Sequence, residues 1–197
     1  MSAVPNILTA LRLLAVPLMV VLFIADDGKE GPLRWAALVV FVAAAATDLL
    51  DGYLARRWEV ITAFGKLADP IADKVLVLGA LAMLAAFDEI PWWPLIVLAV
   101  REVAVTLGRL AVASGTVIPA SAGGKVKTVL LNIALGAMIL PGMPAWVDEV
   151  AWWLLIASIA LAVVTGVDYG AKIARAARQQ RQAATAALAG ERKADAV

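Results

Sequence analysis

The sequence predicts an all-α integral membrane protein, folded as a bundle of six transmembrane helices. Hydrophobic residues make up 63% of the 197 residues and charged residues only 17%, and the mean hydropathy is +0.88. Soluble domains have roughly 45–50% apolar and about 25% charged residues. A membrane-spanning helix needs about 20 apolar residues, and this chain has enough for about six such helices. The composition therefore disfavours a soluble globular enzyme.

Six apolar stretches, separated by polar breaks, are expected to cross the bilayer. They are residues 7–24, 33–50, 71–87, 92–113, 126–140 and 147–167. Pro, Gly and acidic residues mark the breaks at 26–32, 88–91 and 141–144. The first stretch is interpreted as a retained helix rather than a signal peptide, because no small-x-small cleavage pattern follows it. The second and third stretches flank an acidic segment, and the fifth is the shortest.

The distribution of Lys and Arg predicts the orientation, because cytoplasmic loops and helix ends collect these residues. With the N-terminus inside, the outer loops contain only Lys29 and Arg34, and the other fifteen of the 17 basic residues lie elsewhere. We expect residues 1–170 to form the transmembrane domain. Residues 171–197 are expected to form a basic, Ala/Gln-rich cytoplasmic tail that is partly disordered. The predicted location is the inner (plasma) membrane, with both termini cytoplasmic.

The charge balance and two missing residue types restrict the chemistry. The formal net charge is only +1. The chain therefore lacks the excess of basic residues that would point to nucleic acid as a partner. The chain has no Cys and no His, which excludes disulfides, thiolate chemistry and imidazole metal ligands. Carboxylates, Lys, Arg and hydroxyls remain available for any reaction.

The segment between the second and third stretches carries four acids within 26 residues: Asp48, Asp51, Asp69 and Asp73. Ionisable groups near membrane depth are costly and often mark function. The spacings of three and four place each pair on one helix face, and Gly52 and Gly65 allow close helix approach.

Four facing carboxylates repel one another unless a cation lies between them. Oxygen ligands favour Mg²⁺ or Mn²⁺ over zinc, and two such ions suit phosphoryl chemistry. The alternative is that these acids form interfacial salt bridges with nearby basic residues, among them Arg56 and Lys74.

This segment matches every fixed position of the pattern D-x2-D-G-x2-A-R-x8-G-x3-D-x3-D. On these residues the chain resembles the CDP-alcohol phosphatidyltransferases. The resemblance implies a six-helix membrane enzyme, commonly a homodimer, that uses an alcohol to displace CMP from a CDP-linked lipid. It also implies roles for individual residues. Asp48, Asp51 and Asp69 would be metal ligands, Asp73 a further ligand and the catalytic base, and Gly52, Arg56 and Thr62 contacts to CDP-diacylglycerol.

Other polar groups point to the acceptor alcohol. Three motifs, N-x2-T-x2-R, R-E and V-I-P-A-S-x2-G-K-x-K-T, resemble the branch of the family that makes phosphatidylglycerophosphate from CDP-diacylglycerol and sn-glycerol 3-phosphate. Asn6, Thr9 and Arg12 share one helix face and would contribute to CDP-diacylglycerol binding. The acceptor phosphate would be bound by Arg101, Arg109, Ser121, Lys125 and Lys127.

Several alternatives remain open. Arg12 could instead extend to the membrane interface, and Glu102 could form an internal ion pair with a neighbouring cation. The acceptor could be another alcohol, as in cardiolipin synthase or phosphatidylinositol phosphate synthase. A divalent-cation transporter could also use four Asp, although its acids would be expected near the midplane of repeated halves.

Overall fold

The computed structural model describes the backbone of residues 3–58, 63–112 and 122–194. Side chains are described for residues 10–47, 74–108, 126–175 and 178. The described chain is all-helical, and its six helices confirm the prediction of six helical elements. They are α1 (Ala3–Asp26), α2 (Pro32–Trp58), α3 (Ala63–Ala86), α4 (Trp93–Val112), α5 (Ala122–Ile139) and α6 (Ala145–Ala194).

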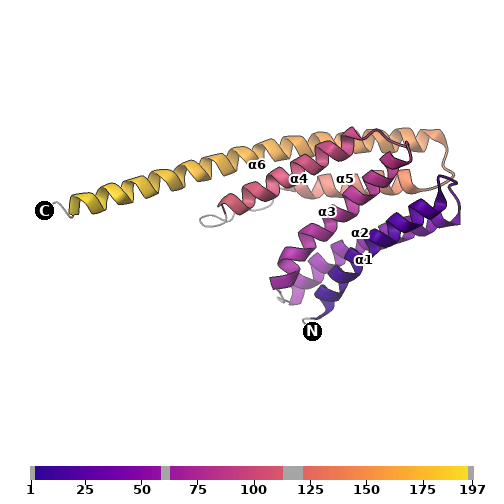
Figure 1. Cartoon of the computed structure of the whole chain (residues 1–197), viewed down its shortest axis with the longest axis horizontal. Coiled ribbons are helices and arrows are strands. Elements are labelled where there is room, and N and C mark those ends of the chain that lie inside the picture. Colours follow the sequence, from indigo (N-terminus) through magenta and orange to yellow (C-terminus); the bar gives the residue numbers. More distant parts are fainter. Residues whose placement is uncertain (1–2, 59–62, 113–121, 195–197) are drawn as a thin grey trace.

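Three short connections, α1–α2, α3–α4 and α5–α6, lie together at one end of the bundle (Figure 1). Left-handed backbone angles reverse the chain there, at Gly28 (φ 68°) and Gly142 (φ 71°), where glycine avoids the steric cost of a side chain. The Asp26 carboxylate fixes the first connection by accepting the Glu30 and Gly31 N–H groups at 2.9 and 3.0 Å. We call this the connector end.

Helix α3 occupies the centre of the bundle. It packs against α1, α2, α4 and α5, while α6 packs along α4 and α5. In Figure 1, α1 and α2 spread away from the line of α6 as they leave the connector end. The central position of α3 matters for the site, because α3 carries the second half of the acidic motif.

The core combines large apolar side chains with buried alanines. The largest fully buried apolar side chains are Phe23, Phe41, Met19, Leu76, Leu81, Leu84, Leu98, Leu135, Ile139 and Leu155. Alanines on α2, α3, α5 and α6 are also buried, and small residues let helices approach closely in membrane proteins. Thus van der Waals packing holds the helices together.

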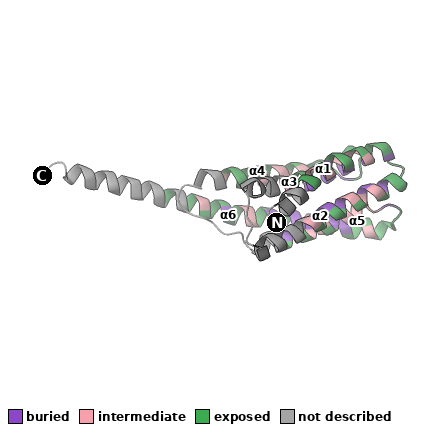
Figure 2. Ribbon diagram, turned by 90° about the horizontal axis from the view of Figure 1, so that it is seen from below, coloured by how far each residue is buried: buried purple, intermediate pink, exposed green. Residues whose placement is uncertain are grey.

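The outer surface carries many large apolar side chains. On α4, the exposed side chains of Ile96, Val100, Val103 and Leu107 recur at helical spacing, and α1 shows a similar stripe. In Figure 2, exposed residues follow the outward faces of the helices while buried ones face the bundle axis. Soluble monomers rarely expose apolar patches of this extent.

One helical stretch among the side-chain-described residues, Ala145–Arg175, is long and apolar enough to cross a membrane by length and composition. Only 28% of its most apolar window is buried within the bundle, so it is not the enclosed core helix of a soluble protein. Shorter apolar helical stretches are Pro32–Thr47, Lys74–Ala86 and Val126–Ile139.

Five of the six described helices extend beyond the predicted apolar stretches, and α2, α3 and α6 do so by the largest margins. Helix α2 continues to Trp58 and α3 begins at Ala63. Helix α6 runs past the predicted domain boundary at residue 170 to Ala194 without a break and projects far beyond the other helices (Figures 1 and 2). Ala, Gln, Arg and Lys are good helix formers, which explains why the helix outlasts its apolar segment.

Candidate active site

The acidic motif lies on two packed helices. Asp48 and Asp51 belong to α2, Asp69 and Asp73 belong to α3, and residues 59–62 join the two helices. Helices α2 and α3 are in contact, and each Asp pair lies within a single helix at an offset of three or four residues. The four side chains lie outside the described residues.

The donor set nevertheless fits hard divalent cations. Four carboxylates at offsets of three and four, on adjacent helices, supply the oxygen ligands that Mg²⁺ and Mn²⁺ prefer. Among the side chains that the structure describes, no group of three acidic, His or Cys residues could hold a metal ion. The acidic motif therefore stays the predicted metal centre.

The other predicted site residues divide into three groups, according to how much of each residue the structure describes. The side chains of Asn6, Thr9, Gly52, Arg56, Gly65, Arg109 and Lys125 lie outside the described residues, although their backbones are helical. Thr62 and Ser121 fall outside the described backbone altogether. The structure describes the side chains of Arg12, Arg101 and Lys127.

Arg12 is enclosed within the bundle. Its side chain is on α1, three turns of helix before the core residue Phe23, and the residue is only 1% exposed. A side chain extending to the membrane interface would be far more exposed, so the structure contradicts that alternative for Arg12.

Arg101 and Lys127 converge on a single carboxylate. Arg101 Nη1 donates to Glu102 Oε1 at 2.6 Å, and Lys127 Nζ donates to the same oxygen at 2.9 Å. Their side chains are 16% and 11% exposed, and that of Glu102 is 14% exposed. The internal ion pair left open by the sequence is therefore present, and it includes two of the predicted phosphate ligands.

A third cation reaches the same carboxylate from α3. Lys74 Nζ lies 3.5 Å from Glu102 Oε2 and donates to the Thr106 hydroxyl at 2.5 Å. Thr106 in turn donates to the Glu102 carbonyl at 2.7 Å. Lys74 directly follows Asp73 in the sequence, so this contact links the cation cluster to the acidic motif. We call Lys74, Arg101, Glu102 and Lys127 the Glu102 cluster.

Arg101 also joins α4 to α6. Its Nε donates to the Ala162 carbonyl at 3.1 Å, and Nη2 donates to the Thr165 hydroxyl at 3.3 Å. The side chain crosses α6 at Gly166, where an added Cβ would meet Arg101 Cγ and Nε at 3.4 Å. Glycine at this position makes room for the arginine, which is therefore fixed from both sides.

A small cavity of about 30 Å³ lies beside the Glu102 cluster, between α3, α4 and α5. Lys74, Glu102, Lys127 and Thr128 form its polar side, and Val77, Leu78, Leu98 and Leu131 form its apolar side. This volume suits about one water molecule. The cluster is thus closely packed against an apolar floor.

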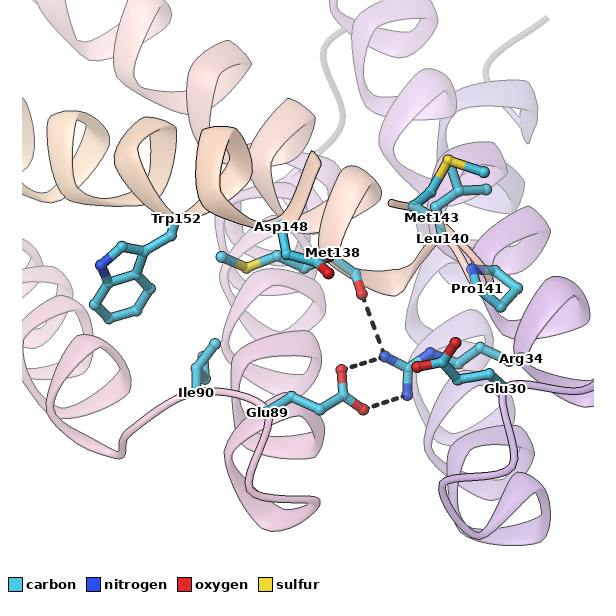
Figure 3. Close-up of a pocket in the computed structure, with 10 residues that line it drawn as sticks. All are labelled: Glu30, Arg34, Glu89, Ile90, Met138, Leu140, Pro141, Met143, Asp148 and Trp152. Carbon is cyan, nitrogen blue, oxygen red and sulfur yellow. Dashed lines mark hydrogen bonds and ion pairs between the residues drawn. The ribbon is translucent and has the colours of Figure 1, made fainter. Parts of the chain in front are cut away.

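A larger cavity, of about 400 Å³, lies at the connector end. Figure 3 shows Arg34 and Glu89 pointing toward each other across it, with Glu30, Asp148 and Trp152 among the residues around them. Arg34 Nη1 donates to Glu89 Oε1 at 2.7 Å, and Nη2 donates to Oε2 at 2.5 Å.

The same arginine binds the end of α5. Arg34 Nε donates to the Ile139 carbonyl at 3.0 Å, and its guanidinium carbon lies 4.2 Å from the centre of the Phe23 ring. Sequence reasoning placed Arg34 only as an outer-loop cation and did not foresee this contact. An arginine at the start of an apolar helix was the available signal.

Comparison with known proteins resolves the family. The family model for CDP-alcohol phosphatidyltransferases matches residues 2–164. The chain belongs to the CDP-alcohol phosphatidyltransferase family. It is thus a member of a family of membrane-embedded, metal-dependent enzymes, which favours the transferase prediction over the cation-transporter alternative.

Three relatives match this CDP-alcohol phosphatidyltransferase over most of their length. This chain is 42% identical over 181 residues to the probable phosphatidylglycerophosphate synthase of Mycobacterium tuberculosis, and the match covers 91% of this chain and 86% of the relative. It is 36% identical to the CDP-diacylglycerol–glycerol-3-phosphate 3-phosphatidyltransferase of Bacillus subtilis, covering 87% and 95%. The Rickettsia typhi protein of the same name is 34% identical, covering 86% and 96%.

Proposed function

We propose that this enzyme transfers the phosphatidyl group of CDP-diacylglycerol to sn-glycerol 3-phosphate, forming phosphatidylglycerophosphate and CMP. The observation that carries the proposal is the complete acidic motif on the packed helices α2 and α3. Relatives of matching length, named for this reaction, support the choice of acceptor.

We place the metal centre at the motif. Asp48, Asp51, Asp69 and Asp73 would hold one or two ions of Mg²⁺ or Mn²⁺. When bound, such ions neutralise charge on the pyrophosphate and on the departing CMP. The chain's own contribution is to keep four carboxylates at fixed helical spacing, so that little reorganisation is needed during the reaction.

Asp73 then acts as the general base. It takes the proton from the acceptor hydroxyl as that oxygen attacks the phosphorus bearing the diacylglycerol. The bond from this phosphorus to the bridging oxygen breaks, and the electron pair leaves with CMP. Gly52, Arg56 and Thr62, together with Asn6, Thr9 and Arg12, orient the nucleotide-linked lipid.

The acceptor phosphate is held by a cationic pocket. Its members are Arg101, Arg109, Ser121, Lys125 and Lys127. The convergence of Arg101 and Lys127 at one point supports this assignment, because a phosphate dianion needs several fixed donors. Positioning two anionic substrates side by side lowers the barrier by orienting them before reaction.

We further propose that all six helices cross the inner membrane, with both termini and the motif on the cytoplasmic side, and that the enzyme is a homodimer. The connector end, with its short loops, then faces outward. The lipid substrate enters sideways from the bilayer, and the soluble acceptor enters from the cytosol.

The decisive experiment is CMP release by the purified protein with CDP-diacylglycerol, Mg²⁺ or Mn²⁺, and a panel of acceptors. We expect release with sn-glycerol 3-phosphate and a product that migrates as phosphatidylglycerophosphate. Release with inositol phosphate or phosphatidylglycerol alone would keep the chemistry and change the acceptor. Absence of release with every acceptor would refute the transferase proposal.

A further inference from the structure

The Glu102 cluster contains more cationic charge than its own carboxylate neutralises. Lys74, Arg101 and Lys127 approach the single carboxylate of Glu102 from three different helices. Among the side chains that the structure describes, three cationic groups around one anionic group leave an excess of two positive charges. Such an excess in a partly buried place is costly unless another anion joins it.

Glu102 uses both carboxylate oxygens to hold these cations. Oε1 accepts from Arg101 and Lys127, and Oε2 pairs with Lys74. Without this carboxylate, two ammonium groups and a guanidinium would lie within a few ångströms of one another and repel. Their side chains would then separate toward water or the interface.

The cations keep capacity for a second anion. A lysine ammonium has three N–H donors and an arginine guanidinium has five. Contact with Glu102 therefore leaves some of these N–H groups able to bind another anion. Lys74 also follows Asp73 directly in α3, so the cluster includes a residue within one helical turn of the proposed base.

We propose that Glu102 is a positioning residue that gathers Lys74, Arg101 and Lys127 so that they can bind the phosphate dianion of the acceptor, with Lys74 as an additional phosphate ligand. This inference rests on the proposed function and assigns a role to two residues outside the predicted pocket. Glu102 touches no substrate in this arrangement and acts through the cations it holds.

The test uses the full-length protein with Glu102→Gln and Glu102→Asp. Gln keeps the shape but removes the charge, and Asp keeps the charge on a shorter side chain. Asp168→Asn is the matched control, because Asp168 pairs with Lys172 at 2.7 Å, both side chains are about half exposed, and neither forms a hydrogen bond or ion pair with the described side chains of the cluster. All variants are first compared with the native protein by size-exclusion chromatography.

Two measurements are made on each protein. The first is the dependence of CMP release on sn-glycerol 3-phosphate at saturating CDP-diacylglycerol. We expect Glu102→Gln to raise KM for the acceptor roughly tenfold, as for loss of one charge-assisted interaction, with KM for CDP-diacylglycerol within about twofold. Glu102→Asp should recover part of the loss, and Asp168→Asn should match the native protein.

The second measurement is equilibrium binding of inorganic phosphate, which needs no turnover. We expect Glu102→Gln to weaken phosphate binding by a similar factor. Phosphate binding tests the positioning role of Glu102 separately from the proposed reaction. If the native protein released no CMP, the reaction would be refuted, but the effect of Glu102 on phosphate binding could still be measured.

Two results would overturn the positioning role. Unchanged KM and phosphate binding in both Glu102 variants, even with lower thermal stability, would leave Glu102 with a structural role alone. A lower KM in Glu102→Gln would show that the carboxylate competes with the acceptor instead of arranging its ligands.

Discussion

Two regions of the bundle use buried ion pairs in opposite ways. At the connector end, Arg34 forms a two-pronged pair with Glu89, and its side chain is 3% exposed. One cation meets one carboxylate there, and backbone carbonyls take the remaining donors. In the Glu102 cluster, three cations share one carboxylate, and their side chains are 11–27% exposed.

This difference distinguishes a structural contact from the proposed phosphate-binding cluster. A charge-balanced pair in which all three guanidinium nitrogens donate holds α2, the α3–α4 connection and the end of α5 together, and it offers little to a ligand. An unbalanced cluster retains attraction for an anion. Both kinds contain basic residues within apolar helices, so the ratio of charges is more informative than the presence of Arg or Lys.

The largest effect is expected at the motif itself. Asp73→Asn removes the proposed base beside Lys74, and we expect turnover to fall about a thousandfold or more. Nucleotide binding, measured with CMP or a CDP-diacylglycerol analogue, should largely persist. Substantial activity in the Asn variant would remove Asp73 from the role of base.

The next largest effect concerns stability at the connector end. Arg34→Leu leaves Glu89 and two backbone carbonyls without their donor, and we expect a loss of about 3 kcal/mol in folding free energy. Thermal unfolding in detergent measures this loss. The KM for the acceptor should stay within about twofold in the folded fraction.

The double variant Arg34→Leu with Glu89→Leu is the control for this prediction. Replacing both partners of a buried pair costs less than removing one, so part of the lost stability should return. A single variant as stable as the native protein would show that the connector contact contributes little.

A smaller effect, but one on substrate binding, is expected from Lys127→Gln. We expect KM for sn-glycerol 3-phosphate to rise roughly tenfold, with kcat less affected, because a charge-assisted contact to phosphate is lost. Thermal stability should change less than in Arg34→Leu. If the KM for the acceptor stays unchanged, Lys127 only neutralises Glu102 and does not bind phosphate.

The smallest effect is expected on the exposed part of α6. Asp168→Asn breaks the pair with Lys172, whose side chains are about half exposed, and we expect a stability change of about 0.5 kcal/mol or less. A larger loss, measured by the same thermal unfolding, would mean that exposed pairs in this protein matter as much as buried ones.

Much of the fold follows from local sequence. The Pro, Gly and acidic breaks predict the three connections, and left-handed residues occur in them at Asp27, Gly28 and Asp88. The helix ends were less predictable. Apolar content defines a span, whereas helix propensity also extends the helix through polar residues, as in α6 beyond residue 167.

The partners within the site could not be predicted in the same way. The acidic motif was readable because its residues lie within 26 positions on two consecutive helices. Glu102, by contrast, contacts Lys74 on α3 and Lys127 on α5, which are 28 and 25 residues away from it in the sequence. Arg34 meets Glu89 across 55 residues. Only the packing of α3 against α4 and α5 brings such residues together.

The length of α6 also sets a distance. At 1.5 Å per residue, its 50 residues measure about 75 Å, more than twice the roughly 30 Å hydrocarbon thickness of a bilayer. The part beyond Arg175 alone reaches about 29 Å to Ala194. If α6 crosses the bilayer as proposed, this length is enough to carry Ala194 clear of the lipid headgroups, and we expect a fluorophore placed near Ala194 to report from the aqueous phase.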